Sequence, residues 1–258
     1  MTPALKYPLW IPPADKLTQY RKREQAKRAD KPQYADNVRK LTVVREISVR
    51  PAAEDFIVKY EYLGTLGPST RAAYGLFMPD GELLGVECFG VPPGDRLKYR
   101  LHPEDPTRVI CLERGACVPW APDHASQLAI TRAIEQAYQT YGWEAVIAYA
   151  DENAGEIGNV YKADSRWIYL GRDVGRGGQP YRAAVIRPGE STPVQTRAHR
   201  KAGLRTRKEA IAAGWQFVLE PTKHVFARFI GPRAADLRRR AIAQFGMRAF
   251  PTRERIAS

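Results

Sequence analysis

Short apolar runs separated by glycines or polar turns dominate the middle of the chain. Residues 145–150 form a run too brief for a helix, which predicts a buried strand ending at Asp151. Gly155 and Gly158 precede a short helical turn at 160–163, and 167–170 predicts a second strand. A carboxylate after a buried strand, followed by glycines and a helix, is a common site geometry in open α/β sheets. Capping of the next helix would equally explain Asp151.

Hydrophobic spacing predicts further elements on both sides of this stretch. Residues 40–49 predict a strand, and Pro51 begins a helix that runs to Gly64. The turn at 79–81 joins strands 70–78 and 82–90 in a hairpin, and 108–118 predicts a fourth strand. A helix capped by Asp123 or His124 follows, with an apolar face from 130 to 141. Beyond residue 171 we expect a strand at 181–187, a helix ending at Gly214, a hairpin of 215–219 with 224–230, and a helix at 234–245.

Composition narrows the class of protein. The 258 residues are 44% hydrophobic, enough for a buried core, and no apolar run approaches the roughly 20 residues that span a bilayer. The first residues lack the apolar stretch of a signal peptide, and three cysteines without a CxxC pair favour reduced thiols over disulfides or a zinc ribbon. A cytoplasmic protein with no membrane partner is therefore expected.

Charge is distributed unevenly. Residues 1–50 hold 12 Lys and Arg against 5 Asp and Glu, 51–170 hold 10 against 17, and 171–258 hold 19 against 6. We expect three parts: a basic, proline-containing arm at 1–38, a catalytic core at 39–171, and a basic extension at 172–258 that completes the sheet. Basic segments of this density favour DNA or RNA as partner over a merely solvated surface, because each neutralised phosphate releases counterions.

The order of elements over 40–171 is β, α, β, β, β, α, β, α, β, which resembles GNAT-type acyltransferases. The resemblance implies an α/β fold with a mixed central sheet flanked by helices, and a cleft where the sheet splays. The phosphate-binding signature of that fold is replaced here by Ala121-Pro-Asp-His-Ala-Ser-Gln127. Backbone amides at this helix start can hold an anion, whereas Asp123 repels one. A coenzyme A thioester as donor is thus left open, with His124, Ala125 and Ser126 as its candidate contacts.

Several short motifs, in their order and spacing over about 55–171 and more loosely 215–255, resemble the Mom family of bacteriophage DNA-modification proteins. The matching segments are Tyr60-Glu-Tyr-Leu-Gly64, Tyr74-Gly-Leu-Phe77, Gly81-Glu-Leu-Leu-Gly-Val86, Phe89-Gly90, Cys111-Leu-Glu-Arg114, Asp123-His-Ala-Ser126, Tyr149-Ala-Asp151, Gly158-Asn-Val-Tyr-Lys-Ala163, Trp167-Ile-Tyr-Leu-Gly171, and Pro221-Thr-Lys-His-Val225 through Phe229-Ile-Gly231. Family members are GNAT-related and convert adenine in phage DNA to an N6-carbamoylmethyl form that resists restriction enzymes. The resemblance therefore implies group transfer to a nucleobase amine.

One position departs from that family. Its members commonly have His-Tyr where this chain has Glu61-Tyr62, and that histidine has been linked with catalysis or bound iron. Glu61 can accept a proton or ligate a hard cation, and it can equally be a surface carboxylate at the end of a helix. Both a metal and the role of Glu61 stay open, with Tyr62 as its neighbour in the candidate site.

An exocyclic adenine amine is a weak nucleophile, so transfer to it requires a base and a polarised donor carbon. We expect Asp151 as the base, because partial desolvation at the opening of the sheet raises a carboxyl pKa. Tyr161 matches the usual GNAT position for the acid that protonates a leaving group, and a packed aromatic residue is its alternative. Ser126 can donate a hydrogen bond to the donor carbonyl, or it can simply cap a helix.

A base inside a duplex is out of reach, so the DNA must be single-stranded or the target base flipped out. Tyr60 and Trp120 are candidates for stacking on that base. Phosphate contacts are expected from two clusters of cations: Arg197, Arg200, Lys201, Arg205, Arg207 and Lys208, and Arg238, Arg239 and Arg240. Two other functions also fit the sequence: a GNAT-fold N-acyltransferase that uses coenzyme A on RNA, protein or a small molecule, and a non-catalytic DNA-binding protein.

Overall fold

The structure is a computed structural model that describes residues 7–10, 42–61, 63–173, 181–191 and 193–252. Most of the predicted arm at 1–38 lies outside these residues, as does Tyr62. Among the described residues, no helix has the length and apolar character needed to cross a membrane. All three cysteines are free thiols.

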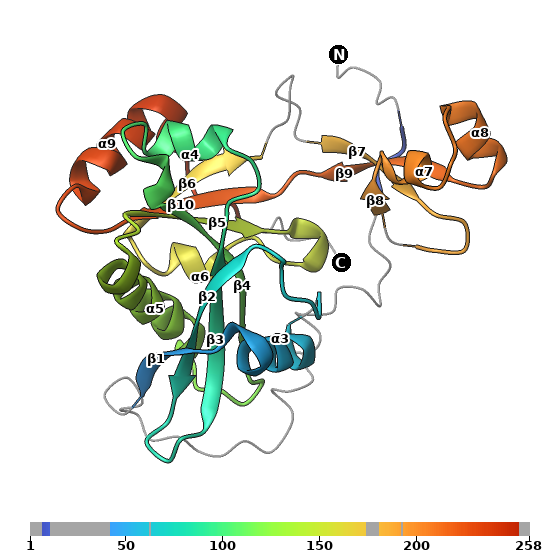
Figure 1. The fold of residues 1–258 in the computed structure, drawn as a ribbon. Helices are drawn as coiled ribbons and strands as arrows, with labels where there is room; N and C mark the ends of the chain where they lie inside the picture. The colour runs from blue at the N-terminus through green and yellow to red at the C-terminus, as the bar shows by residue number, and fades with distance from the viewer. Residues whose placement is uncertain (1–6, 11–41, 62, 174–180, 192, 253–258) are drawn as a thin grey trace.

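A seven-stranded mixed sheet forms the centre of the molecule (Figure 1). Its strands, in spatial order, are β1 (Val43–Ile47), β2 (Thr70–Phe77), β3 (Leu83–Gly90), β4 (Val109–Cys117), β5 (Ala145–Ala150), β10 (His224–Phe229) and β6 (Trp167–Arg172). Every neighbouring pair is antiparallel except β4 and β5, which run parallel. The predicted α/β class with a mixed central sheet is confirmed, as is the hairpin of β2 and β3.

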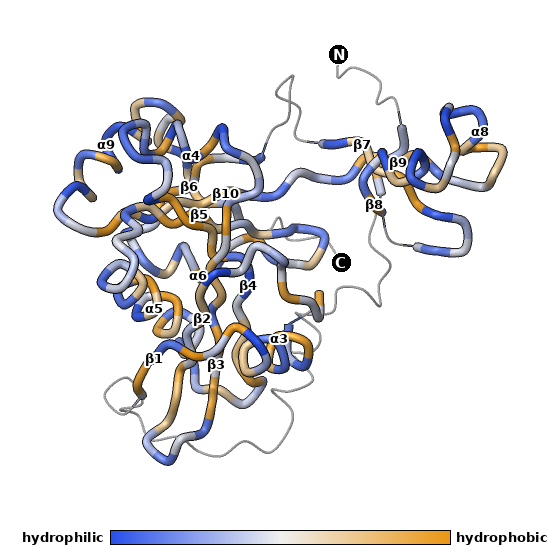
Figure 2. The backbone as a smooth tube through the Cα atoms, in the orientation of Figure 1, coloured by the Kyte–Doolittle hydropathy of each residue, from blue (hydrophilic) through white to orange (hydrophobic). Residues whose placement is uncertain are grey.

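Helices cover the sheet because the strands at its centre are apolar on both faces. Figure 1 shows α3 (Glu54–Tyr60) and α5 (Ala125–Tyr141) on opposite sides of β2 and β3. Figure 2 shows hydrophobic colour where β5 and β10 lie side by side, and α9 (Ala234–Phe245) packs on β5, β6 and β10 through Leu237 and Ala241. Two core clusters result, one around α3 and α5 and the other under α9.

The helix α5 (Ala125–Tyr141) can be compared with its prediction at its apolar face and at both of its ends. Its predicted apolar face is buried, with Ile130 and Ile134 in the core, and Gly142 ends it with φ 68°, a left-handed conformation that glycine adopts without strain. His124 stands at the N-cap position, also left-handed, but its side chain makes no capping hydrogen bond. The predicted cap position is therefore confirmed at His124, without the side-chain hydrogen bond that usually accompanies an N-cap.

The helix α4 (Arg96–Leu101) lies between the expected strands 82–90 and 108–118, where hydrophobic spacing predicted no element. Arg96, Lys98 and Arg100 leave it only a narrow apolar side, Leu97 and Leu101, which packs into the core cluster under α9. Tertiary packing of two leucines therefore stabilises a helix too short to form alone.

A second sheet of three antiparallel strands stands apart from the first (Figure 1). It contains β8 (Pro193–Gln195), β7 (Tyr181–Ile186) and β9 (Gln216–Pro221), with the short helices α7 (Ala198–Lys201) and α8 (Arg207–Ala212). We call residues 181–221 the basic unit. The predicted hairpin of 215–219 with 224–230 is wrong: β9 pairs with β7, whereas β10 lies between β5 and β6. The chain passes from one sheet into the other at 222–223 without reversing.

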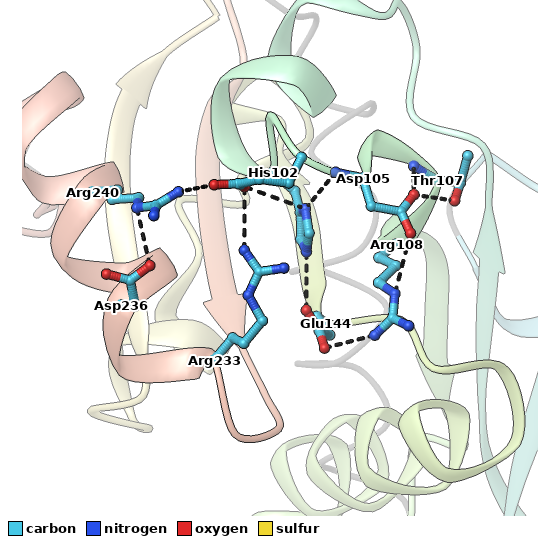
Figure 3. A network of polar contacts seen from close by, with 9 residues as sticks. His102, Asp105, Thr107, Arg108, Glu144, Arg233, Asp236 and Arg240 are labelled. Atoms are coloured by element: carbon cyan, nitrogen blue, oxygen red, sulfur yellow. Dashed lines mark hydrogen bonds and ion pairs between the residues drawn. The ribbon is translucent and has the colours of Figure 1, made fainter.

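A buried ionic network joins α4, α9 and the start of β5 (Figure 3). His102 is fully buried, and its Nε2 lies 2.9 Å from Glu144 Oε2. Because the backbone N–H of Asp105 donates to Nδ1 of His102 (3.0 Å), the imidazole proton is on Nε2 and is donated to Glu144. Arg108 Nη1 donates to the other oxygen of Glu144 at 2.7 Å.

Candidate active site where two strands part

The parallel strands β4 and β5 pair over only part of their length. Val109 to Leu112 are hydrogen-bonded beside Ala145 to Ala148, and the strands separate beyond that point. A cavity of about 690 Å³ opens there, lined by the ends of both strands, the first turns of α5, the short helix α6 (Asn159–Lys162) and the end of α3. The splayed sheet implied by the GNAT-type element order is therefore present.

Four of the residues singled out in the sequence meet in this cavity: Glu61, Ser126, Asp151 and Tyr161. They come from four different elements, so only the fold brings them together. His124, Ala125, Tyr60 and Trp120 are not among the lining residues. Asp151 and Tyr161 thus share one cleft, as a base and an acid of one reaction must.

The cavity lining is acidic. Three basic side chains, Arg114, Arg182 and Lys223, face six carboxylates: Glu61, Glu87, Glu113, Asp151, Glu156 and Asp173. A low-dielectric cleft of one sign focuses its field on whatever enters. The cavity consequently favours a neutral or cationic group and disfavours phosphate.

Asp151 both caps a turn and faces the cleft. Its Oδ1 accepts the backbone N–H of Asn153 at 3.0 Å, which starts a 3-10 turn at Glu152–Ala154. Its Oδ2 lies 3.3 Å from Nζ of Lys223, which comes from the junction between the two sheets. The two interpretations of this residue are therefore compatible, but both carboxylate oxygens already have a partner.

Glu61 is a buried carboxylate at the C-terminal end of α3, with 5% of its surface exposed. Its Oε2 accepts the backbone N–H groups of Leu63 and Gly64 at 2.7 and 3.2 Å. Desolvation raises the pKa of Glu61, against the opposing effects of these hydrogen bonds and of the nearby charges on Arg114 and Lys223. The alternative of an ordinary surface carboxylate is excluded. A buried carboxyl with a raised pKa is the form of this group that suits proton abstraction near neutral pH.

Tyr161 places a phenol at the wall of the cavity while its ring packs in the core. The ring centroid lies 4.6 Å from that of Trp167 and 4.9 Å from that of Phe226. Burial raises the pKa of Tyr161, and the nearby charge of Glu87 adds to the shift. The hydroxyl therefore keeps its proton at neutral pH and can act as a hydrogen-bond donor or an acid, not as an anionic nucleophile.

The start of α5 does not fit a coenzyme A pyrophosphate. Residues 118–131 contain neither a glycine nor a lysine or arginine, and exposed Asp123 adds a negative charge beside the helix start. Ser126 lines the cavity, but its hydroxyl is already engaged and donates to Sγ of Cys117 at 3.3 Å. Within the described part of the chain, no group of three or more His, Cys, Asp or Glu side chains is placed to hold a metal ion such as iron.

Three residues that sequence reasoning did not select also line the cavity: Glu87, Glu113 and Lys223. The two glutamates had a signal, since each interrupts a run of apolar strand residues, and carboxylates buried in strands need a partner or a purpose. Lys223 had none, because its place depends on the path from β9 into β10. Of these three residues only Lys223 is basic, so its ammonium group is the one that can offset the negative charge of the carboxylates in the cleft.

The two predicted clusters of phosphate-binding cations lie on opposite sides of the main sheet in Figure 1. All six cations of the first cluster, which lies in the basic unit, are exposed, and Arg207 stacks on Tyr7 and Phe217. The arginines of α9 are engaged within the protein: Arg238 donates to the carbonyl of Arg166, Arg239 pairs with Asp236, and Arg240 pairs with Glu104 and Asp236. Arg239 and Arg240 are also exposed, with 76% and 48% of their side chains accessible, but unlike the first cluster each shares its charge with a carboxylate among the described residues.

The predicted stacking residues Tyr60 and Trp120 contact each other edge to face, with ring centroids 6.1 Å apart. Trp120 Nε1 donates to Glu82 Oε1 at 2.9 Å, and both rings pack against the core cluster of α3 and α5. Stacking on a nucleobase by either ring stays a prediction.

Comparison with known proteins supplies a family. A model described as the Mom protein family matches residues 41–241. Solved structures that resemble this one include an IAA acetyltransferase from Bacillus cereus (TM-score 0.39, 9% identity, 73% of this chain and 99% of that one). A GCN5-related N-acetyltransferase from Kribbella flavida has a TM-score of 0.36 at 13% identity, over 74% of this chain and 99% of that one. Similarity at this level carries no argument about activity. None of the curated protein sequences matches the chain.

Proposed function

This chain belongs to the Mom protein family, and we propose that it is a group transferase that modifies the exocyclic amine of adenine in DNA. The group transferred would be carbamoylmethyl or a related acyl-type group, and its effect would be to shield the DNA from restriction enzymes. The observation that carries the proposal is the joint placement of Glu61, Asp151 and Tyr161 in one acidic cleft at the parting of β4 and β5.

The charge of the cleft suits a flipped base better than a nucleotide held by its phosphates. Adenine is neutral and offers N–H donors to carboxylates, whereas a phosphate would face six carboxylates and three cations. If a flipped base enters alone and its sugar-phosphate backbone stays outside, the adenine reaches the carboxylates and the phosphates avoid them. The basic unit begins beside the cleft, because Arg182 of β7 is one of the lining residues.

Glu61 is the better candidate for the base, in preference to Asp151. A base must present a free lone pair to the amine and have a pKa near the working pH. Glu61 is anchored through one oxygen only and its pKa is raised, whereas both oxygens of Asp151 have partners. Asp151 is then an acceptor that orients the N6 amine, and Lys223 offsets the charge between the two carboxylates.

Bond changes in the proposed transfer are heterolytic and involve no oxidation. The N6–carbon bond forms as the bond from that carbon to the donor's leaving group breaks. The N6 proton passes to the carboxylate of Glu61, and the Tyr161 hydroxyl gives a proton to the leaving group. Solvent restores both side chains. The raised pKa of Tyr161 makes the phenol a weaker acid, so it gives up its proton only to a leaving group that already carries negative charge.

The decisive measurement is mass spectrometry of nucleosides from the DNA of cells that express the protein. We expect a modified deoxyadenosine in these cells and its loss in Asp151→Asn cells. Adenine that stays unmodified with the wild-type chain would contradict the proposal. Stabilisation of the protein by coenzyme A in a thermal-shift titration would instead favour an acyltransferase of the coenzyme A type.

Phosphate contacts from the basic unit yield a separate prediction. Arg200 is exposed and pairs with no acidic side chain of the described residues. Arg200→Ala should weaken binding to duplexes of unrelated sequence about equally, and lower the slope of log affinity against log salt by about 1. Arg96→Ala, which removes an exposed arginine of α4 on the other side of the molecule, should leave the slope unchanged. Fluorescence anisotropy at several salt concentrations measures both, and equal slopes for the two variants would remove the basic unit from the proposed interface.

A further inference from the structure

We infer that Glu113 is the residue that selects the transferred group, by accepting hydrogen bonds from its carboxamide nitrogen. The inference rests on the proposed function and deepens it, since it concerns the donor and not the adenine.

Glu113 is the extra residue of a β-bulge in β4. On β3, Cys88 opposes Arg114 and Phe89 opposes Leu112, so Glu113 has no partner in the ladder. A bulge re-aims a side chain that regular pleating would point elsewhere, and bulges are frequent next to active sites. This one lies just where β4 begins to part from β5, and Glu113 lines the cavity that opens there.

Two hydroxyl groups hold the carboxylate of Glu113. Ser69 donates to its Oε1, and Thr70 Oγ1 donates to its Oε2 at 2.7 Å. Two glycines provide the space: a Cβ at Gly90 would lie 2.2 Å from Cδ of Glu113, and one at Gly67 would lie 3.0 Å from Oε2. The two hydroxyls therefore fix the carboxylate from one side. Any side chain larger than glycine at 67 or 90 would collide with Glu113 and displace it.

The remaining acceptor capacity matches a carboxamide. A carboxylate accepts about four hydrogen bonds, and the two hydroxyls take two, which leaves about two for a ligand. The NH₂ of a carbamoylmethyl group donates two. An acetyl group of similar size offers none, and a site built to hydrogen-bond an N–H group discriminates strongly against an analogue without it. The acidic lining of the cavity adds to this preference, because it repels a carboxylate in place of the amide.

Modification in cells tests the inference. Glu113→Gln keeps the shape of the side chain but replaces one acceptor by a donor, and we expect it to lower the fraction of modified adenine about 10- to 100-fold. Glu54→Gln, an exposed-side change at the start of α3, is the matched control and should behave as the wild type. Thermal unfolding of the purified variants should show equal stability. Full modification by Glu113→Gln would overturn the inference.

A binding experiment keeps the inference separate from the proposed function. Saturation-transfer NMR with acetamide and with acetone compares two neutral molecules of similar shape, of which only acetamide has N–H donors. We expect a stronger signal from acetamide than from acetone with the wild-type protein, and equal signals with Glu113→Gln. Equal signals with the wild type would overturn the inference. If the wild type makes no modified adenine, the proposed function fails, and this comparison alone decides the role of Glu113.

Discussion

Glu61→Gln is expected to lower adenine modification by about 100-fold or more, because a positioned general base contributes roughly 10²- to 10⁴-fold. The amide has the size of the carboxylate and can keep the hydrogen bonds from Leu63 and Gly64 through its carbonyl oxygen. It cannot take the proton of N6. Lysates buffered at different pH and supplied with unmodified duplex DNA, followed by nucleoside mass spectrometry, measure the loss.

The pH dependence of the wild-type activity tests whether Glu61 is the base. A base works only when ionised, so activity should fall as the pH decreases through the pKa of Glu61, and burial moves that fall to a higher pH than an exposed glutamate would give. The residual activity of Glu61→Gln should lack this limb. Glu54→Gln should reproduce the wild-type profile. A wild-type rate that stays constant down to the ordinary pKa of a glutamate would contradict the assignment.

Stability should change in the opposite direction to activity at this position. Between the ordinary and the raised pKa, the folded protein binds more protons at Glu61 than the unfolded chain does, so this residue lowers stability as pH rises through that window. Glutamine has no charge to desolvate. Glu61→Gln should therefore be at least as stable as the wild type above the window, which separates a catalytic loss from a folding loss.

Glu144→Ala is expected to destabilise the fold by about 3 kcal/mol, since it removes a buried carboxylate acceptor and leaves a buried donor unsatisfied, which costs about 1–3 kcal/mol. The change leaves Nε2–H of fully buried His102 without its acceptor and Arg108 without one of its carboxylate contacts (Figure 3). Arg108 is half exposed and can turn to water, so the loss of its contact with Glu144 adds little to that cost. In urea unfolding, the midpoint should fall with little change in slope.

Two other substitutions serve as comparisons for the loss of stability in Glu144→Ala. Glu144→Gln retains one acceptor oxygen and should lose less stability than Glu144→Ala. Glu104→Ala removes exposed contacts to Arg233 and Arg240 in the same network and should have a smaller effect than either. Equal midpoints for the wild type and Glu144→Ala would show that the network contributes nothing to stability.

Local pattern was a sound guide wherever the neighbours that decide a conformation are close in the chain. The two apolar runs at 70–78 and 82–90 around a turn predicted the hairpin of β2 and β3, helical spacing predicted α5 with its buried face, and a helix was correctly expected at α9. It failed for α4, whose leucines need α9 to pack against, and for β9 and β10, whose partners are far away in sequence. No local signal distinguishes a strand that turns back from one that continues into another sheet.

For the candidate site, too, the sequence predicted some features and the tertiary structure decided others. The residue types were readable from the chain: a carboxylate after a buried strand, a tyrosine ten residues on, and an acidic centre between basic ends all follow from order and composition. Their chemistry was not, because a pKa depends on what surrounds a group in space. Burial of Glu61, the contact of Lys223 with Asp151 and the bulge that aims Glu113 all arise from strand pairing and packing between distant segments. Desolvation and register are properties of the assembled sheet, and no single stretch of the chain contains them.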